Sequence, residues 1–496
     1  MLTSGIIGSV FKAIPSVKFT VVGDTAIEFA GSTSPSVSVD WGDGQALVDI
    51  TSTQVVVKSY NDGRPSHQVK VYGSCGMVYL GVAGYETSVI SVDDWGNGGF
   101  YLDNASIFSQ SILTGCLGLQ SVPEDAPPIT NFNHLFRGIE GIPSEIVSWD
   151  TSNVTNMNAA FKSTTGNINL STWDTSNVTD MSFMFEGYLG TNIVTGFNTS
   201  KVVTMEGMFL GCTNFNSSVS SFDTSSVVNF SSMFEECRVF NQPIDNFITS
   251  NGILFEYMFS SCHAFNQPIN HLDLSNATSA AYMFNSCLVL NQSTTGMDFS
   301  NISNFSHMFY NADRLFNLDL GYLENGTNFA FMFAAMTYVA FTSLKFPPGA
   351  NFVVLFLFST VNATNIDISA VTSLNTFFAN AYSVNGSLGD TSHITSMSYL
   401  FSEANNVFYD FSAFDISGVT SLSGMFNDVD NFTGDLSSWD TGHITDMSYM
   451  FADSNITNPQ ISAWDVSSVV ECTSFRLNSS LACVNTPALP TLCTGC

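Results

Sequence analysis

The sequence has very little positive charge. Of its 496 residues only 12 are Lys or Arg, against 42 Asp and Glu, which gives a formal net charge of -30. Proteins that bind nucleic acid cluster Lys and Arg against the phosphates, so this composition excludes a nucleic-acid partner. The polar surface is expected to consist of Ser, Thr and Asn. Such surfaces suit extracellular or particle-surface proteins, although many intracellular proteins are also acidic.

Long apolar runs are also missing. No stretch of about 18 residues is free of polar interruption, so no membrane span is predicted. The first basic residue is Lys12, and an apolar start with no basic residue before it makes a poor secretory signal. A surface-type protein without a signal peptide fits a virus or phage particle, which is assembled in the cytoplasm and released by lysis.

The motifs of common catalytic sites are absent from the sequence. It contains no G-x-S-x-G, no H-E-x-x-H and no phosphate-cradling Gly loop. Its seven His are scattered, and only His263 and His271 are near neighbours. We therefore expect a protein that is not an enzyme and that carries no cofactor.

The chain does contain a repeat that recurs fifteen times. Each copy closes on a Phe, and successive copies are 22–25 residues apart. A period this regular predicts a solenoid, because each unit is too short to bury its apolar face except against its neighbours. The closing residues, expected to form one interior column, are Phe136, Phe161, Phe185, Phe209, Phe234, Phe259, Phe284, Phe309, Phe333, Phe356, Phe378, Phe401, Phe426, Phe451 and Phe475.

One repeat, residues 168–185, shows the expected local structure. Met181 and Met184 lie four and one residues before Phe185, a spacing typical of one face of a short helix. Thr179, and Thr445 in a later repeat, would cap the start of that helix. The alternating run Ile168, Leu170 and Thr172 predicts a strand. Each unit would then add one strand and one helical turn to a stack with a parallel β-sheet on one wall.

These repeats resemble a known family. The residues that carry the resemblance are W-D-T-S-N-V-T-D-M-S-x-M-F, as at 173–185, and F-N-Q-P-I, as at 240–244 and 265–269. They are similar to the BspA-type leucine-rich-repeat surface proteins of bacteria. The match covers residues 131–475 and weakens between 318 and 385, where Tyr322 and Lys345 replace the usual Asp. The resemblance implies a curved solenoid on a cell or particle surface that binds a partner.

The rest of the chain divides into further domains by its pattern of apolar and polar residues. Residues 1–15 are an apolar arm or anchor, and 16–100 alternate in the manner of an antiparallel β-sandwich. The run 37–44, V-S-V-D-W-G-D-G, resembles the WGDG signature of PKD-like modules. Residues 101–130 read as a cap, 131–475 as the solenoid and 476–496 as a Cys-containing C-terminal cap. The predicted fold is mainly β: a PKD/Ig-like sandwich followed by a leucine-rich-repeat-like parallel β-solenoid of about 15 coils.

A ladder of Asp residues is the most conspicuous candidate site. Each carboxylate is expected to accept a backbone N–H two residues on, in an Asx-turn that ends the strand. The functional alternative is Ca²⁺ held between coils by oxygen ligands. The members are Asp150, Asp174, Asp223, Asp273, Asp298, Asp367, Asp390, Asp415 and Asp440, with Asp465 one place out of register.

Asn and Cys form ladders of their own. The amides of Asn216, Asn241, Asn266 and Asn291 are expected to bond to one another and to the next coil. The 25-residue spacing of Cys212, Cys237, Cys262 and Cys287 predicts buried thiols in a core column, with a metal or disulfide ladder as the alternative. The C-terminal group could form disulfides or a Zn site, and it comprises Cys472, Cys483, Cys493 and Cys496.

Taken together, these features predict a non-enzymatic, surface-exposed binding or attachment protein, either a virion component or an adhesin. Its solenoid would contact a host-surface protein or glycan, because wall positions vary between coils, as at Thr172, Ser220, Asn270 and Ser438. The N-terminal region would join other virion or surface proteins in a homo-oligomer or larger assembly. The alternatives are a purely structural virion protein, a bacterial cell-surface adhesin, and a glycan-degrading enzyme.

Overall fold

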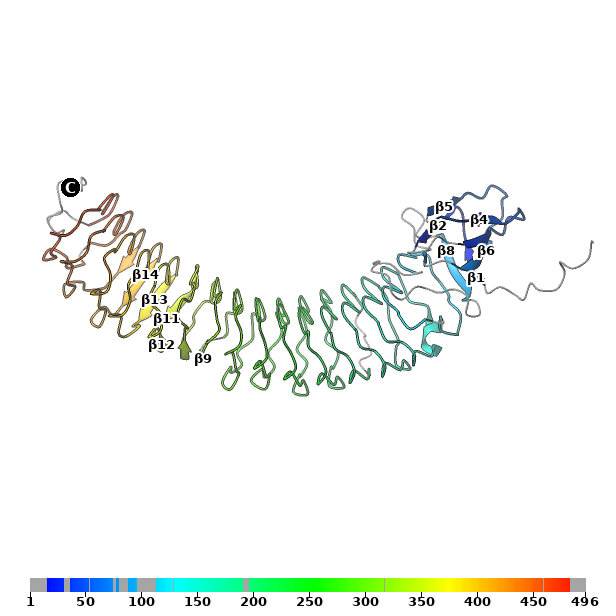
Figure 1. Cartoon of the computed structure of the whole chain (residues 1–496), viewed down its shortest axis with the longest axis horizontal. Coiled ribbons are helices and arrows are strands. Elements are labelled where there is room, and N and C mark those ends of the chain that lie inside the picture. Colours follow the sequence, from blue (N-terminus) through cyan, green and yellow to red (C-terminus); the bar gives the residue numbers. More distant parts are fainter. Residues whose placement is uncertain are drawn as a thin grey trace, which may run out of the picture. The chain divides into compact units, whose positions relative to one another are not determined.

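The computed structural model describes residues 16–30, 36–52, 54–74, 77–79, 88–95, 113–127, 129–190, 196–315, 317–457 and 459–481 (Figure 1). The predictions made for the arm at 1–15, and for Cys483, Cys493 and Cys496, lie outside these residues. The chain forms two compact units, Met1–Val227 and Val228–Cys496.

The first unit begins with two antiparallel sheets. The larger has the order β4-β3-β6-β1-β8 and the smaller β5-β2-β7. Alternation of apolar and polar residues places Val17, Phe19 and Val21 in the core, where Phe19 lies opposite the buried Val69. The strands are β1 (Ser16–Val21), β2 (Thr25–Ala30), β3 (Ser36–Asp40), β4 (Val48–Ile50), β5 (Gln54–Lys58), β6 (His67–Ser74), β7 (Met77–Tyr79) and β8 (Val89–Asp94).

Strand β8 links these sheets to the first described coil. On one side it pairs antiparallel with β1. On the other side, Ser91 forms a parallel bridge with Ser121, and Val92 donates its N–H to the Ser121 carbonyl at 3.1 Å. The indole N–H of Trp95, just after β8, donates to the Asp125 carbonyl at 2.9 Å. The sheet therefore continues into the solenoid by backbone pairing.

The closing Phe residues form a stacked interior column in each unit. In the first unit, consecutive rings from Phe136 to Phe209 lie 5.4–5.7 Å apart. In the second, the rings from Phe234 to Phe475 follow one another at 5.4–5.9 Å, stacked as far as Phe451 and edge-to-face between Phe451 and Phe475. All of these rings are buried. The mainly-β solenoid fold predicted from the spacing is confirmed.

The helical turn expected before each closing Phe is wrong. Among the described residues there is no α-helix, and the one helical element is the 3-10 helix η1 (Ser144–Ser148). Residues two before and two after the Phe have positive φ, as at Phe183 (55°) and Gly187 (68°), which a right-handed helix cannot contain. Their N–H groups point along the stack to next-coil carbonyls, Phe183 to Glu206 at 2.7 Å and Gly187 to Leu210 at 2.7 Å.

The helix caps and the strand predicted in the repeat are also wrong. The hydroxyls of Thr179 and Thr445 donate to carbonyls of the preceding coil, at 3.2 and 3.1 Å. No strand forms at Ile168–Thr172, because the Asn169 side chain accepts the Ser171 N–H at 3.1 Å and turns the chain. Among the described coils, regular strands occur in the second unit, mainly where the repeat motif weakens.

Those strands form two parallel sheets in the second unit, ordered β12-β10-β9 and β11-β13-β14-β15. Runs such as L-D-L-G-Y and F-T-S-L-K replace F-N-Q-P-I there, so no Pro removes a backbone donor. Figure 1 shows β11, β13 and β14 in successive coils. The strands are β9 (Leu318–Tyr322), β10 (Phe341–Lys345), β11 (Thr360–Asn362), β12 (Ile366–Asp367), β13 (Ser383–Gly386), β14 (Asn406–Tyr409) and β15 (Asn431–Phe432).

Candidate binding surfaces

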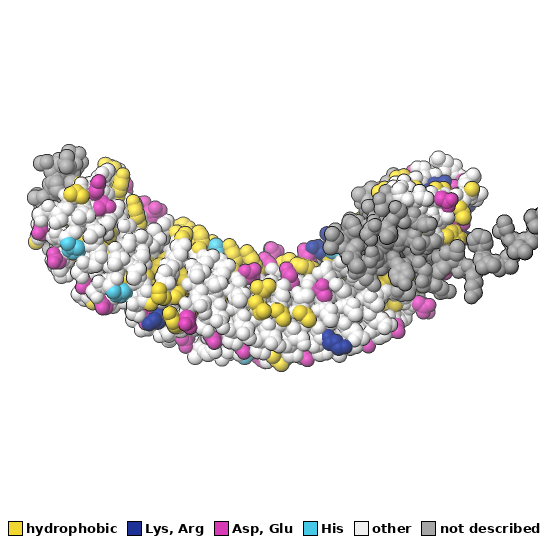
Figure 2. Space-filling model, in the orientation of Figure 1, with side chains coloured by type: hydrophobic (Ala, Val, Ile, Leu, Met, Phe, Trp, Pro, Cys, Tyr) yellow, Lys and Arg dark blue, Asp and Glu magenta, His cyan; other side chains and the backbone are white. Residues whose placement is uncertain are grey.

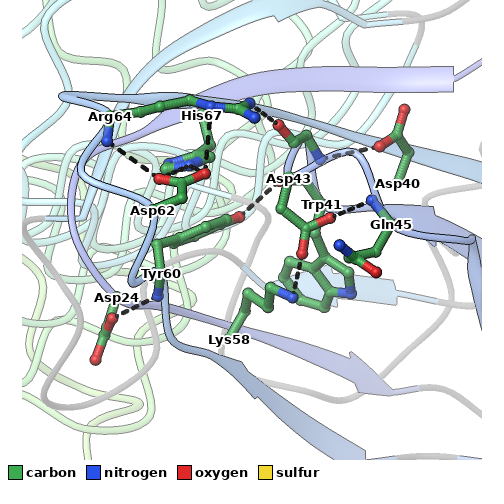
Figure 3. Close-up of polar contacts among 11 residues, drawn as sticks. Asp24, Asp40, Trp41, Asp43, Gln45, Lys58, Tyr60, Asp62, Arg64 and His67 are labelled. Carbon is green, nitrogen blue, oxygen red and sulfur yellow. Dashed lines mark hydrogen bonds and ion pairs between the residues drawn. The ribbon is translucent and has the colours of Figure 1, made fainter.

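The WGDG turn after β3 is braced by its own carboxylates. Asp40 accepts the Gly42 N–H at 2.9 Å, and Asp43 accepts the Gln45 N–H at 3.0 Å (Figure 3). Lys58 on β5 forms an ion pair with Asp43, and its hydrogen bond lowers the pKa of that carboxyl. A Cβ at Gly42 would run into the Gln68 carbonyl, so the turn requires glycine there.

Tyr60, in the loop between β5 and β6, holds the same turn, and His67 at the start of β6 supports Tyr60. The Tyr60 hydroxyl donates to the Trp41 carbonyl at 2.8 Å, and its ring stacks on His67 at 3.7 Å (Figure 3). The buried His67 Nε2 contacts both oxygens of Asp62, at 2.9 and 3.0 Å. The arrangement is a rigid brace, since its side chains are engaged with the turn or with one another.

The Asp ladder of the solenoid has the expected Asx-turn geometry. Asp150, Asp174 and Asp223 each accept the N–H two residues on, at 2.9–3.0 Å. The same bond spans 2.7–3.2 Å at the remaining members, Asp273, Asp298, Asp367, Asp390, Asp415, Asp440 and Asp465. Hydrogen bonds from the following Ser hold the pKa of Asp150, Asp174 and Asp223 below the ordinary value. The carboxylates therefore stabilise the turns in which they lie.

No group of three or more His, Cys, Asp or Glu is placed to hold a metal ion within the ranges that the structure describes. The ladder carboxylates follow one another singly, one in each coil that has an Asp, and each is already bonded to its own turn. The Ca²⁺ alternative stays a prediction.

The Asn ladder joins adjacent coils in the second unit. Asn241 accepts the backbone N–H of Asn266 at 2.9 Å, and Asn266 accepts that of Asn291 at 3.0 Å. The side-chain amides of Gln267 and Gln292 donate to the same two Asn side chains, each at 2.9 Å. The bonding between side-chain amides and the next coil's backbone is as predicted.

The Cys column is buried and reduced. Cys212, Cys237, Cys262 and Cys287 are 0% exposed, and none of the four is in a disulfide. The thiols of Cys212 and Cys262 donate to the carbonyls of Phe185 and Phe234 at 2.9 Å. By contrast, Cys472 near the C-terminus is disulfide-bonded.

A column of aromatic side chains, missed by the sequence reasoning, lies on the surface of the second unit. It occupies the variable position x of M-S-x-M-F, where the backbone has positive φ. We call it the aromatic column, and it comprises Tyr257, Tyr282, His307 and Phe331. Neighbouring rings stack at 4.3–4.7 Å and all four are partly exposed. The signal was present in the sequence as four ring-bearing residues at x in consecutive repeats.

A hollow of about 560 Å³ lies between two later coils of the second unit. Its walls combine three aromatic residues, two carboxylates and several hydroxyls. The lining residues are Phe408, Tyr409, Asp410, Phe411, Ser412, Thr433, Gly434, Asp435, Ser437 and Ser438. Of these, only Ser438 had been singled out from the sequence.

The visible face of the molecule is dominated by uncharged polar groups, with scattered acidic side chains, few Lys or Arg and patches of hydrophobic side chains (Figure 2). This agrees with the 12 basic residues in the whole chain. A search of the described residues for a helix that could span a bilayer found none.

Comparison with known proteins identifies the repeats. The family described as "Mycoplasma protein of unknown function, DUF285" matches residues 124–192, 188–297, 255–346, 282–391 and 372–483. No curated protein and no solved structure matches the chain. The matches together span 124–483, well over half of the 496 residues, and their repeated, overlapping form agrees with the stacked coils. The chain therefore belongs to the DUF285 family of repeat proteins.

Proposed function

We propose that this protein is a non-enzymatic binding or attachment protein at the surface of a cell or virion. Its solenoid contacts a host-surface protein or glycan, and its N-terminal sheets join other proteins of the same surface. The resemblance of the repeats to BspA-type surface proteins, and of the WGDG turn to PKD-like modules, supports this proposal. The scarcity of Lys and Arg argues against an anionic partner.

The observation that carries the proposal is the aromatic column. Solenoid core positions are fixed by packing, whereas position x faces outward and varies. Four consecutive coils place rings there at positive φ, a conformation that costs about 1 kcal/mol or more for a non-Gly residue. Elsewhere the same position holds Ser232 or Gly207, so the fold itself does not require rings. Partly exposed aromatic side chains are typical of recognition surfaces.

The two carboxylates that line the hollow lack the raised pKa expected of the acid in a glycosidase. A glycosidase needs one carboxyl with a raised pKa to protonate the leaving group. Asp410 and Asp435 are the two carboxylates of the hollow, and Ser hydrogen bonds lower the pKa of both. Two carboxylates with lowered pKa can accept hydrogen bonds from a ligand, which suits binding of its hydroxyl groups.

The test is binding of the purified chain to arrays of immobilised glycans and host-surface proteins. The triple variant Tyr257→Ser, Tyr282→Ser, Phe331→Ser installs the residue that repeats tolerate at Ser232. It should lose at least tenfold in affinity for the array ligand. The matched control is Tyr449→Ser, which changes a 41% exposed Tyr at position x in a distant coil.

Unchanged binding by the triple variant would refute a role of the aromatic column. Release of shorter products from any bound glycan would refute the non-enzymatic assignment. A chain that binds nothing on either array, yet assembles into particles, would favour the purely structural virion protein. Binding together with display on bacterial cells would place the protein among cell-surface adhesins.

A further inference from the structure

The hollow in the second unit is built by the register of two neighbouring coils. Val407 of β14 pairs in parallel with Phe432 of β15, and the Thr433 N–H donates to the Val407 carbonyl at 3.2 Å. Beyond the strands, residues 25 apart therefore lie side by side. Outward-facing residues alternate along both coils. This alternation places Phe408 beside Thr433, Asp410 beside Asp435 and Ser412 beside Ser437.

Gly434 lies in the wall of the hollow, where the neighbouring core rings leave no room for a side chain. Gly434 follows Thr433 at the position that Tyr409 occupies in the previous coil. A Cβ there would collide with the rings of Phe432 and Phe411, so no larger residue fits without rearrangement. The Tyr409 ring is buried and its hydroxyl accepts the Leu388 N–H at 2.6 Å, directed toward the preceding coil. The hollow is thus fixed by backbone and core contacts rather than by loose side chains.

The walls combine the groups that a sugar ring requires. Phe408 leaves 44% of its surface exposed and offers an apolar ring. Asp410 and Asp435 each use one oxygen to accept a Ser N–H, at 3.0 and 2.9 Å. Neither carboxylate is ion-paired with any basic residue that the structure describes. Ser412, Ser437 and Ser438 add hydroxyls that can both donate and accept.

A second observation comes from the adjoining core. In other coils the Trp indole N–H donates to a carbonyl of the preceding coil, Trp464 to Leu436 at 3.0 Å and Trp173 to Ile146 at 2.8 Å. The corresponding N–H of Trp439 is buried and has no acceptor in the described part of the chain. Trp439 directly follows Ser438, and its ring contacts Phe411. Ser438 and Phe411 line the hollow.

From these features we propose that the hollow binds one neutral pyranose ring of a glycan. The apolar C–H face of the sugar packs on Phe408, and its hydroxyls donate to Asp410 and Asp435 and accept from the Ser side chains. A volume of about 560 Å³ accommodates a single ring with adjacent linkages. This inference rests on the proposed function, of which it specifies the ligand class.

The charge of the site excludes acidic sugars. Two ionised carboxylates with no basic partner repel a sialate or uronate carboxylate. A Lys side chain would be attracted by the same two charges and is the competing ligand. The site favours the sugar because hydroxyl groups, which match a neutral polyol, outnumber carboxylates in the wall, and because both carboxylates are already hydrogen-bonded within their turns.

The experiment uses the full chain and four probes: the methyl glycosides of glucose, galactose and mannose, and N-acetyllysine amide. Binding is measured by saturation-transfer NMR and by Trp fluorescence, with Trp439→Phe to identify the reporting residue. At least one neutral glycoside should bind in the millimolar range, as expected for one exposed sugar ring. Phe408→Ala and Asp435→Asn should each weaken it at least tenfold.

Two variants serve as matched controls. Asp390→Asn changes a carboxylate in the same kind of Asx-turn outside the hollow, and Tyr449→Ser changes an exposed aromatic residue elsewhere; both should bind the glycoside like the parent chain. Phe408 and Asp435 are exposed, so folding of these variants is checked by circular dichroism and is expected to be unchanged.

The outcomes separate this inference from the proposed function. If no neutral glycoside binds, or if the lysine amide binds instead, the sugar site is refuted, even where array binding through the aromatic column persists. If a glycoside binds but Phe408→Ala and Asp435→Asn leave its affinity unchanged, the ligand lies elsewhere and the inference also fails. If the glycoside binds through the hollow while the triple variant keeps its array affinity, only the aromatic column is refuted.

Discussion

Replacing Phe259 with Ala should open a hole in the interior column. The ring is 0% exposed and stacks on Phe234 at 5.6 Å, Phe284 at 5.8 Å and Phe265 at 4.4 Å. Loss of a buried phenyl ring costs about 3–5 kcal/mol through lost transfer energy and the cavity left behind. The stacked geometry places the expected value in the upper half of that range, because each aromatic pair adds about 0.5–1.5 kcal/mol beyond burial.

The effect should be confined to neighbouring coils. Each coil contacts only the coils before and after it, and Phe259 donates its own N–H to Met283 in the next coil at 3.0 Å. Native-state hydrogen exchange with mass spectrometry resolves this. A loss of about 3–5 kcal/mol corresponds to protection lower by about 10²–10⁴-fold. Peptides spanning residues 234–290 should show it, whereas those around Phe426 and Phe451 should not.

The control is Ile253→Ala in the same coil. Ile253 is 40% exposed, so its truncation should cost about 1 kcal/mol or less. Equal protection from hydrogen exchange in the two variants would contradict the assignment of Phe259 to an interior column that stabilises the coils. Uniform loss of protection over residues 228–481 would show that the coils unfold as one unit, and the neighbour-coupled description would be wrong.

Three further predictions concern the ladders. Asn266→Ala removes the acceptor for the Asn291 N–H and the Gln292 amide and should lower stability by about 0.5–1.5 kcal/mol in urea unfolding, since both donors can turn to water. Hydrogen bonds from Ser176 lower the pKa of Asp174. The contribution of this carboxylate to folding stability is therefore complete above the unfolded-state pKa of about 3.9, and it is lost as the pH falls through the lower native-state pKa. The melting temperature should drop below about pH 4, and Asp174→Asn should make it depend less on pH in that range. Burial raises the pKa of the Cys212 thiol to about 12, so a maleimide at pH 8 should label it only after denaturant is added, and labelling of the native chain would contradict its place in the core.

The interior column could be predicted from the sequence because it depends on a single quantity, the spacing between successive closing Phe residues. A constant step between closing Phe residues fixes both the stacking direction and the residue that fills each coil. The antiparallel sheets at the N-terminus followed similarly from alternation in segments such as 17–21. In both cases the period of the apolar residues carries the structural information by itself.

The helical turn was predicted wrongly because apolar spacing is ambiguous over one turn. Residues at -4, -1 and 0 share a face in a helix, and they also share one in the linked tight turns seen here. The distinguishing signal was glycine at the two positive-φ positions, as at Gly207 and Gly211. Glycine tolerates that conformation without steric cost. Inter-coil hydrogen bonds then offset the cost where Phe183 or Tyr257 takes the same place.

The hollow could not have been predicted because it depends on lateral register. Its carboxylates come from an Asx-turn that recurs throughout the chain, so Asp410 and Asp435 are not distinguished by type. What sets them apart is that Phe408 is exposed next to them and that Gly434 lies where the previous coil has Tyr409. These relations appear only when the coils are stacked.

The pairing of β8 with the first described coil affects whether copies of this chain can associate end to end. A solenoid end is a row of unpaired backbone groups that fits the opposite end of any other copy, which is a route to head-to-tail polymerisation. Here Ser91 of β8 forms a parallel bridge with Ser121, and β8 is in turn paired antiparallel with β1. The reversal of strand direction ends the parallel series, so an incoming coil finds no matching template. We therefore expect the N-terminal sheets to hinder filament growth from that end.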